Sequence, residues 1–197
     1  MQLTKPQKQI YDTDKVIGGA VSNICGSIII EGTIDIALLI NAVNELFRLN
    51  DSLRIRIMEH NGEPSQSIAN YTSKDINILF FESQKQLDDY GQTVAQQPMD
   101  IYSELCEINI ISLPMSYGLL IKMHHLVGDA WTLSLLCSQF ISLLNGKSPV
   151  TYSYADYVAK EHLYLTSPRQ NKDRKYFIDQ FKNNDDISYG FLSGRFH

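Results

Sequence analysis

The spacing of apolar and polar positions predicts an alternation of helices and strands along the whole chain. Apolar residues three or four positions apart indicate helices, whereas alternation and short β-branched runs indicate strands. Helices are predicted over 3–14, 36–49, 83–97, 129–144, 152–165 and 169–183. Strands are predicted over 24–31, 53–58, 76–82, 105–112 and 117–124, with 65–70 returning on 53–58 as a hairpin. This order predicts an α+β fold in one domain, with a mostly antiparallel sheet packed with helices.

The local pattern that calls most for an explanation is IKMHHLVGDAWTLSL at 121–135, where two adjacent histidines end an apolar strand. Neighbouring residues of a strand point to opposite faces, so His124 and His125 cannot both face one cavity. Asp129 precedes an apolar helix at the position of an N-cap, where a carboxylate accepts from backbone amides. The residues alone leave two interpretations open: a buried hydrogen-bonding cluster with a capping aspartate, or a chemical site.

The same pattern disfavours two kinds of catalytic site. Adjacent strand histidines diverge, and no third ligand stands at a suitable spacing, so no metal site is expected. The GxSxG turn that presents the nucleophile of many Ser-His-Asp hydrolases does not occur in the sequence. A chemical site here would therefore use one histidine as a general acid or base, with a nearby carboxylate fixing its geometry.

Composition and charge exclude several other classes of protein. The formal net charge is −5, and the chain has no basic run of the kind that a nucleic-acid surface needs. Cys25, Cys106 and Cys137 lie in apolar runs without metal-ligand spacing, which predicts neither disulfides nor zinc and favours a reducing compartment. No apolar run reaches the length of about 20 residues that crosses a bilayer, and the N-terminus lacks the apolar core of a signal peptide. We therefore expect a cytoplasmic protein that binds neither nucleic acid nor membrane.

HHLVGDAW, at 124–131, resembles the HHxxxDG signature of the condensation domains of nonribosomal peptide synthetases, in the chloramphenicol-acetyltransferase-like superfamily. Four further segments resemble motifs of that family and follow the family's order along the chain. They are LTKPQKQIY at 3–11, RLNDSLRIRIMEHNGEPSQSI at 48–68, QQPMDIYSELCEINII at 96–111 and YSYADYVAKEHLYL at 152–165. Together the five segments span nearly the whole chain.

The chain also departs from the family pattern. Ala130 replaces the final glycine of the signature, and Lys160 stands where the last motif commonly has an aromatic residue. Leu-Asn-Asp at 49–51 replaces the Arg-His-Glu of the second motif. The family's second lobe, which has a similar fold and motifs of its own, has no counterpart because too few residues follow His125.

The resemblance implies a single chloramphenicol-acetyltransferase-like half. The N-terminal lobe would cover 1–185, and 186–197 would be a tail or the start of the connection to a missing second lobe. The implied activity is that of an acyltransferase, in which an acceptor amine attacks a thioester and forms a peptide bond. Both substrates would arrive on 4′-phosphopantetheine arms of donor and acceptor peptidyl carrier proteins, and no cofactor would bind directly. The second lobe and neighbouring synthetase domains are further implied partners.

The resemblance also assigns roles to individual residues. His125, the second histidine of the signature, would be catalytic, either as the base for the attacking amine or as a stabiliser of the charged tetrahedral intermediate. His124 and Asp129 would support the site structurally. Asp129 is expected to bind the amides at the helix start and to pair with Arg54 or Arg56, which the strand pattern places on one face. The other interpretation makes these arginines solvent-facing partners of Glu59 or Glu63 on the hairpin.

Two other functions remain open at this stage. One is an acyltransferase of the same superfamily that carries the HxxxD pattern and uses acyl-CoA. The other is a non-catalytic half-domain that docks a carrier protein or a neighbouring domain. A heterocyclising condensation domain is disfavoured because that variant replaces the first histidine of the signature by aspartate, and His124 is present. As part of a two-lobe condensation domain, the isolated lobe is expected to form no peptide bond.

Overall fold

The computed structural model describes residues 1–182, so the expected tail or connection at 186–197 lies outside the described residues. The chain divides into two compact units, Met1–Val158 and Ala159–His197. The first unit holds the sheet and most of the helices, and the second holds the end of one helix and the helix after it.

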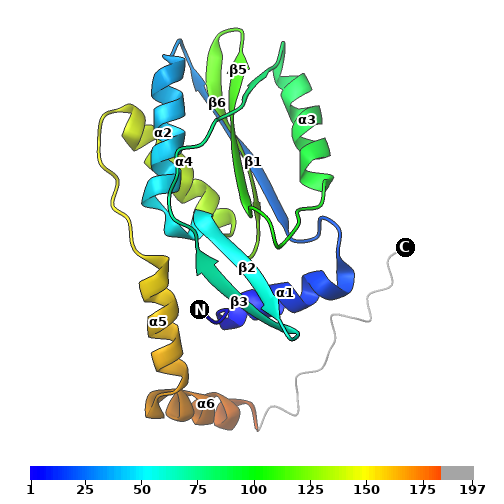
Figure 1. Ribbon diagram of the computed structural model, residues 1–197, viewed down its shortest axis with the longest axis vertical. Coiled ribbons are helices and arrows are strands. Elements are labelled where there is room, and N and C mark those ends of the chain that lie inside the picture. The colour runs from blue at the N-terminus through cyan, green and yellow to red at the C-terminus, as the bar shows by residue number, and fades with distance from the viewer. Residues whose placement is uncertain (183–197) are drawn as a thin grey trace. The chain divides into compact units, whose positions relative to one another are not determined.

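A four-stranded sheet forms the centre of the first unit in the described residues. Its order is β1 (Asn23–Glu31), β6 (Ser116–His124), β5 (Cys106–Leu113) and β4 (Ile78–Phe80). β6 runs antiparallel to both of its neighbours, and only β4 pairs in parallel with its neighbour β5 (Figure 1). The predicted α+β fold with a mostly antiparallel sheet is therefore confirmed.

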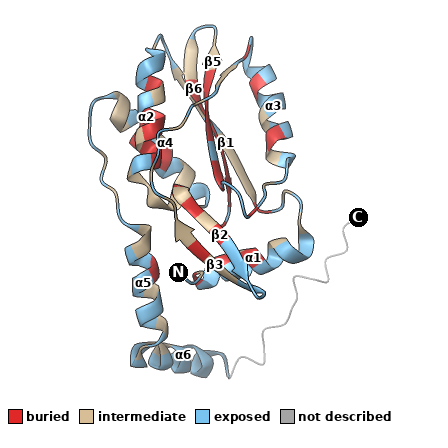
Figure 2. Cartoon of the chain, in the orientation of Figure 1, coloured by how far each residue is buried: buried red, intermediate tan, exposed pale blue. Residues whose placement is uncertain are grey.

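Helices cover both faces of this sheet. The helices of the described chain are α1 (Lys5–Ile17), α2 (Ile36–Leu49), α3 (Gln84–Gln96), α4 (Ala130–Leu144), α5 (Tyr154–Leu165) and α6 (Pro168–Phe181). Helices α2 and α4 contact each other beside β6, whereas α3 contacts β1 and β6 from the other face (Figure 1). Figure 2 shows that buried residues concentrate on the central strands and on the sides of α2 and α4 that face them.

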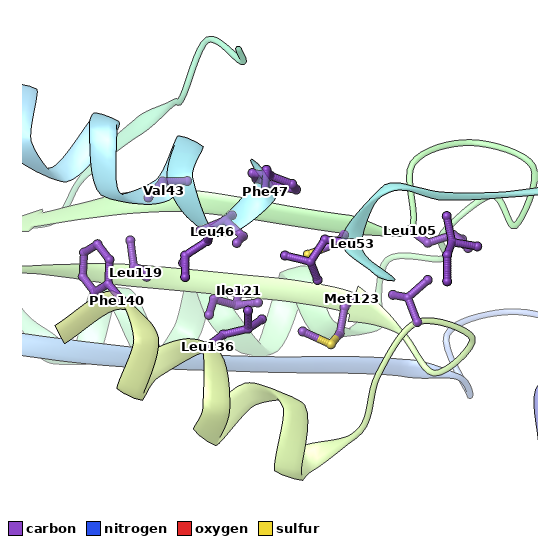
Figure 3. Packing of buried hydrophobic residues seen from close by; sticks show 14 of the residues in the cluster. Val43, Leu46, Phe47, Leu53, Leu105, Leu119, Ile121, Met123, Leu136 and Phe140 are labelled. Atoms are coloured by element: carbon purple, nitrogen blue, oxygen red, sulfur yellow. The ribbon is translucent and has the colours of Figure 1, made fainter. Parts of the chain in front are cut away.

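The alternation of side chains along β6 divides the core into two clusters. Leu119, Ile121 and Met123 point between α2 and α4, where they pack against Leu46 and Leu136 (Figure 3). The other parity of β6 faces α3, so Leu120 packs with Leu87 and Phe81. Because both faces are covered, β6 reads in the sequence as a continuous apolar run and brings the histidine pair to the end of a rigid central strand.

The predicted strand at 53–58 begins later than expected. Asp51–Arg54 forms a short 3-10 turn, η1, and β2 (Ile55–His60) pairs with β3 (Glu63–Ile68) only after it. The reason is the end of α2, whose last carbonyl groups lack helical partners. The Arg54 guanidinium turns back and donates to the carbonyl oxygens of Phe47 and Arg48, which holds the chain in a turn.

The predicted hairpin is present, but β3 begins at Glu63 rather than at residue 65, so the turn consists of Asn61 and Gly62 alone. Asn61 and Gly62 both have positive φ, of 52° and 81°. Two positive φ values give a turn whose twist matches that of the flanking strands, and Asn-Gly is the pair that adopts it most readily.

Two other elements have different bounds from those predicted. β4 keeps only Ile78–Phe80 of the predicted strand 76–82 because only these residues pair with β5. The first helix runs to Ile17 rather than to residue 14, and Gly18 ends it with a φ of 65°. In the second unit, Ser167 accepts from the amide of Gln170 and caps α6, whose predicted end at 183 lies outside the described residues.

Candidate functional site

The two histidines of the pair have opposite surroundings. His124 ends β6 and is 1% exposed, whereas His125 begins the loop to α4 and is exposed. The prediction that only one of the two imidazoles can face a cavity is confirmed. The geometry therefore gives His124 a buried, structural environment and leaves the ring of His125 accessible.

His125 lies in an open cleft of about 340 Å³ within the first unit. The start of α1, the loop from 125 to 129 and the start of α5 line this cleft. Pro6, Ile10, Tyr154 and Tyr157 supply apolar and aromatic surface there. An exposed imidazole over a partly apolar cleft can exchange a proton with a group that binds in it.

The backbone around His125 is fixed by hydrogen bonds to separate elements. The His125 amide donates to the carbonyl oxygen of Ser22 at 2.8 Å, just before β1 begins. The amide of Val127 donates to the carbonyl oxygen of His124 at 3.0 Å and closes a tight turn. The exposed ring is thus carried on a backbone that has little freedom to move.

Asp129 acts as the predicted N-cap of α4. Its Oδ1 accepts from the amide of Thr132 at 2.9 Å, and its own amide donates to Thr132 Oγ1 at 3.1 Å, which completes a capping box. The hydrogen bond from the Thr132 amide lowers the pKa of the Asp129 carboxyl below its usual range. Asp129 therefore anchors the loop that carries His125 to the start of a helix.

The predicted pairing of Asp129 with an arginine is wrong. In the described structure, Arg54 binds carbonyl oxygens, among them that of Ala69 at 3.0 Å, and Arg56 pairs with Glu104 at 2.6 Å. Neither arginine contacts Asp129 there. Arg54 binds the carbonyl groups at the end of α2 instead, and Arg56 binds the carboxylate of Glu104.

The other interpretation of these arginines is also wrong, because neither Glu59 nor Glu63 pairs with Arg54 or Arg56 in the described residues. Glu59 accepts from Tyr11, Tyr102 and Lys15 and has no arginine among its partners in the described residues. These three donors lower the pKa of Glu59, with the Tyr102 hydroxyl the largest cause, followed by Tyr11 and Lys15.

One residue near the site was missed by the sequence reasoning. Asp51, in the segment that departs from the second motif, accepts from the amide of Tyr154 at 2.9 Å with either carboxylate oxygen. It also accepts from the hydroxyl of Ser153 at 3.3 Å. Asp51 thus joins the second motif to the last one and fixes the start of α5 beside the cleft. Its only sequence signal was an acidic residue directly after a helix end.

Replacing Asp129 with alanine is expected to lower the free energy of unfolding by about 1 kcal/mol, because the Thr132 amide loses its acceptor. Asp129→Asn should retain most of that stability, since asparagine caps as well as aspartate does. Urea unfolding monitored by circular dichroism measures both variants. Equal stability of the alanine variant and the wild type would contradict the capping role.

The same contact predicts a pH dependence. Because the pKa of Asp129 is lower in the folded than in the unfolded state, its contribution is fully present above the unfolded pKa of about 3.9 and is lost as pH falls through the folded value. Asp129→Asn removes this titration, so the wild type and the asparagine variant should converge in stability in acid. Parallel stability curves would show that the carboxylate does not contribute.

Gly128 occupies a place with no room for a side chain. A Cβ there would lie 2.8 Å from Met123 Sδ and 2.9 Å from Thr132 Cγ2. Gly128→Ala is therefore expected to cost about 1–3 kcal/mol by overpacking. Gly91→Ala in α3 is the matched control, because no atom lies within 4 Å of its Cβ, and it should raise stability by up to about 1 kcal/mol. Thermal unfolding compares the two, and a Gly128→Ala melting temperature at or above that of the wild type would contradict the expectation.

Within 1–182, no three or more His, Cys, Asp or Glu side chains are grouped so that they could hold a metal ion. No helix in the same range combines the length and the apolar character needed to cross a bilayer.

Comparisons with known proteins show the family to which this chain belongs. The family model for the condensation domain matches residues 1–188. Surfactin synthase subunit 1 of Bacillus subtilis (strain 168) is 27% identical over 203 residues, which cover 92% of this chain and 6% of that protein. Tyrocidine synthase 2 of Brevibacillus parabrevis is 27% identical over 165 residues, which cover 82% of this chain and 4% of that protein.

Solved structures show the same fold. The starter condensation domain of the rhizomide synthetase RzmA superposes with a TM-score of 0.81 at 19% identity, covering 93% of this chain and 48% of that one. The first condensation domain of the CDA synthetase gives a TM-score of 0.75 at 17% identity, covering 93% of this chain and 50% of that one. The chain spans about half the length of these solved chains, so the prediction of a chloramphenicol-acetyltransferase-like half is confirmed. On the match of the family model over residues 1–188, the chain belongs to the condensation domain family of the nonribosomal peptide synthetases.

Proposed function

We propose that residues 1–185 are the N-terminal lobe of a condensation domain that forms peptide bonds. Condensation domains are acyltransferases, and the reaction proposed here is attack of an acceptor amine on a carrier-bound aminoacyl or peptidyl thioester. The observation that carries the proposal is His125, an exposed imidazole over an open cleft on a backbone that is held from several sides.

His125 is the proposed catalytic residue. Its ring takes the proton that the amine loses as the new C–N bond forms, or hydrogen-bonds to the charged tetrahedral intermediate; both roles need the imidazole within hydrogen-bonding reach of the amine. When the intermediate collapses, the carbon–sulfur bond breaks and the thiolate leaves as a thiol after protonation. Holding two tethered substrates against each other supplies a further part of the rate.

The supporting residues take narrower roles than the sequence suggested. His124 and Asp129 support the loop that carries His125, the first from the strand side and the second from the helix side. Arg54 and Arg56 do not line the cleft in the described structure, and we assign them to the junction of α2 with β2 and to the Glu104 loop.

The proposed partners follow from the family. Donor and acceptor peptidyl carrier proteins bring the substrates on 4′-phosphopantetheine arms, and the chain itself binds no cofactor directly. A second lobe and neighbouring synthetase domains complete the assembly, consistent with curated relatives that are many times longer than this chain.

One observation favours a second candidate function. A solved structure of the RzmA starter condensation domain is described as a complex with C8-CoA. By analogy, the donor here would be an acyl-CoA rather than a carrier-bound thioester. A third candidate is a half-domain that docks carriers without turnover.

Donor competition separates these candidates. The lobe is joined to a second condensation lobe and given a carrier-bound acceptor with either a carrier-bound aminoacyl donor or an acyl-CoA donor. Amide product detected by mass spectrometry with the carrier-bound donor is the expected result. Product with the CoA donor alone would transfer the assignment to the acyl-CoA class, and carrier binding without product from either donor would favour the docking function.

A further inference from the structure

The backbone of Leu126, the residue that follows His125, is held at both its amide and its carbonyl group. The amide of Leu126 donates to His124 Nδ1 at 3.2 Å, and the carbonyl oxygen of Leu126 accepts from Gln7 Nε2 at 2.9 Å. Leu126 is 2% exposed, so water has no access to replace either partner. Any change in these two contacts must therefore move the backbone of the residue next to His125 or leave a buried polar group without a partner.

The contact with the Leu126 amide defines the tautomer of His124. Nδ1 accepts a hydrogen bond, so it carries no proton, and the neutral ring has its proton on Nε2. Nε2 lies 3.3 Å from Asp14 Oδ1 and donates to it. Burial lowers the pKa of His124, against the opposing effect of Asp14, and favours this neutral form. Asp14 thus orients the ring that holds Leu126.

The orientation of Gln7 is defined in the same way. Its Oε1 accepts from the amide of Thr4 at 2.9 Å and from Gln66 Nε2 at 2.8 Å. Those contacts need an oxygen, which leaves Nε2 to face the Leu126 carbonyl. Gln7 is 4% exposed and Gln66 is 0% exposed, so this amide pair is as rigid as the core around it.

We propose that Gln7 and Asp14 are positioning residues for His125. They lie two helical turns apart on the same side of α1, where Gln7 holds the Leu126 carbonyl directly and Asp14 holds the Leu126 amide through His124. Because the His125 amide is also fixed by Ser22, α1 and the start of β1 together set the place of the catalytic backbone. The expected effect of these two residues on turnover rests on the proposed catalytic role of His125. Their expected effect on the structure of the loop rests on the contacts alone.

Two substitutions of His124 separate its two contacts. In His124→Asn, the asparagine Oδ1 lies near the position of the histidine Nδ1 and can accept from the Leu126 amide, as in an Asx turn. The asparagine side chain is too short to reach Asp14. His124→Gln reaches toward Asp14 with its Nε2, but its acceptor Oε1 lies one bond farther along the side chain than Nδ1 and so is misplaced for the Leu126 amide. Both variants lose part of the buried ring, so loss of packing is common to the pair.

Hydrogen exchange of the Leu126 amide, followed by NMR on the 197-residue chain, is the structural test. Exchange should accelerate at least about fivefold more in His124→Gln than in His124→Asn, the effect of one lost hydrogen bond. In the wild type, the nitrogen chemical shifts of the ring should show Nδ1 unprotonated and Nε2 protonated. Equal exchange in the two variants, or a protonated Nδ1, would overturn the inference.

Asp14 and Gln7 are tested by their own matched changes. Asp14→Asn keeps an oxygen that can accept from Nε2, whereas Asp14→Leu does not, so only the leucine variant should release the His124 ring from α1 and accelerate exchange of the Leu126 amide. Gln7→Glu keeps the shape but turns an acceptor toward the Leu126 carbonyl, and it should accelerate exchange of the His125 and Leu126 amides. Unchanged exchange of the Leu126 amide in Asp14→Leu together with unchanged exchange in Gln7→Glu would remove both residues from the proposal.

The functional test uses the lobe joined to a second condensation lobe. His124→Gln should lower kcat for amide formation more than His124→Asn does, by about fivefold or more, with KM for the carriers unchanged. A merely stabilising role would instead lower the fraction of folded protein equally in both, and equal kcat values per folded molecule would overturn the positioning role. If the wild-type assembly forms no amide at all, the proposed function fails, while the exchange and ring-shift measurements still decide the positioning of the loop.

Discussion

Replacing His125 with alanine is expected to lower kcat for amide formation by about 10²–10⁴-fold, the range that a positioned general acid or base contributes. The ring is exposed and stands over the cleft, so its loss removes the proton acceptor or the hydrogen-bond donor of the reaction without opening a cavity in the core. The free energy of unfolding should therefore change by less than about 0.5 kcal/mol, as for other surface substitutions. The assay uses the lobe joined to a second condensation lobe, with carrier-bound donor and acceptor.

The chain supplies a matched control for this substitution. His60, at the end of β2, is also exposed and does not line the cleft. His60→Ala should leave both turnover and unfolding unchanged. If His125→Ala retained more than a tenth of the wild-type kcat, proton transfer or charge stabilisation by this ring would be too small to count as the catalytic step.

The helices and strands could be predicted because each depends on the spacing of apolar residues within a short stretch of sequence. β6 and α4 appear at nearly the predicted residues, since an apolar strand and a capped apolar helix depend on neighbours a few positions away. The split of His124 and His125 followed from strand parity alone. The strand expected from residue 53 was mistaken at its start, because the turn there depends on Arg54 reaching back to the end of another element.

The candidate site was predictable only in part. Residue patterns located the histidine pair and the cap, and the resemblance to a family then favoured a chemical site over a structural cluster. The partner of Asp129 was wrongly predicted, because which charged groups meet across the fold is not contained in periodicity. Gln7 and Asp14 lie 119 and 110 positions from the residues they hold. Local sequence patterns, which extend over a few helical turns, contain no information on contacts between residues so far apart in the sequence.

The 197-residue chain on its own is expected to form no peptide bond, even though it carries the proposed catalytic histidine. His125 is exposed in an open cleft, so charge that develops on the amine is screened by water, where two unit charges at 4 Å interact by only about 1 kcal/mol. The chain also spans about half of the solved condensation domains it resembles. Without the other half, neither tethered substrate is held against the other, and the advantage of proximity is lost.

The test supplies carrier-bound donor and acceptor to the chain alone, then to the chain mixed with a separately expressed second condensation lobe. We expect no amide above the uncatalysed background from the chain alone, and restored turnover in the mixture that His125→Ala abolishes. His60→Ala in the same mixture should behave as the wild type, because its ring lies outside the cleft lining. Turnover by the chain alone that disappears with His125→Ala would show that one wall of the cleft suffices, and that enclosure by a second lobe contributes little to the reaction.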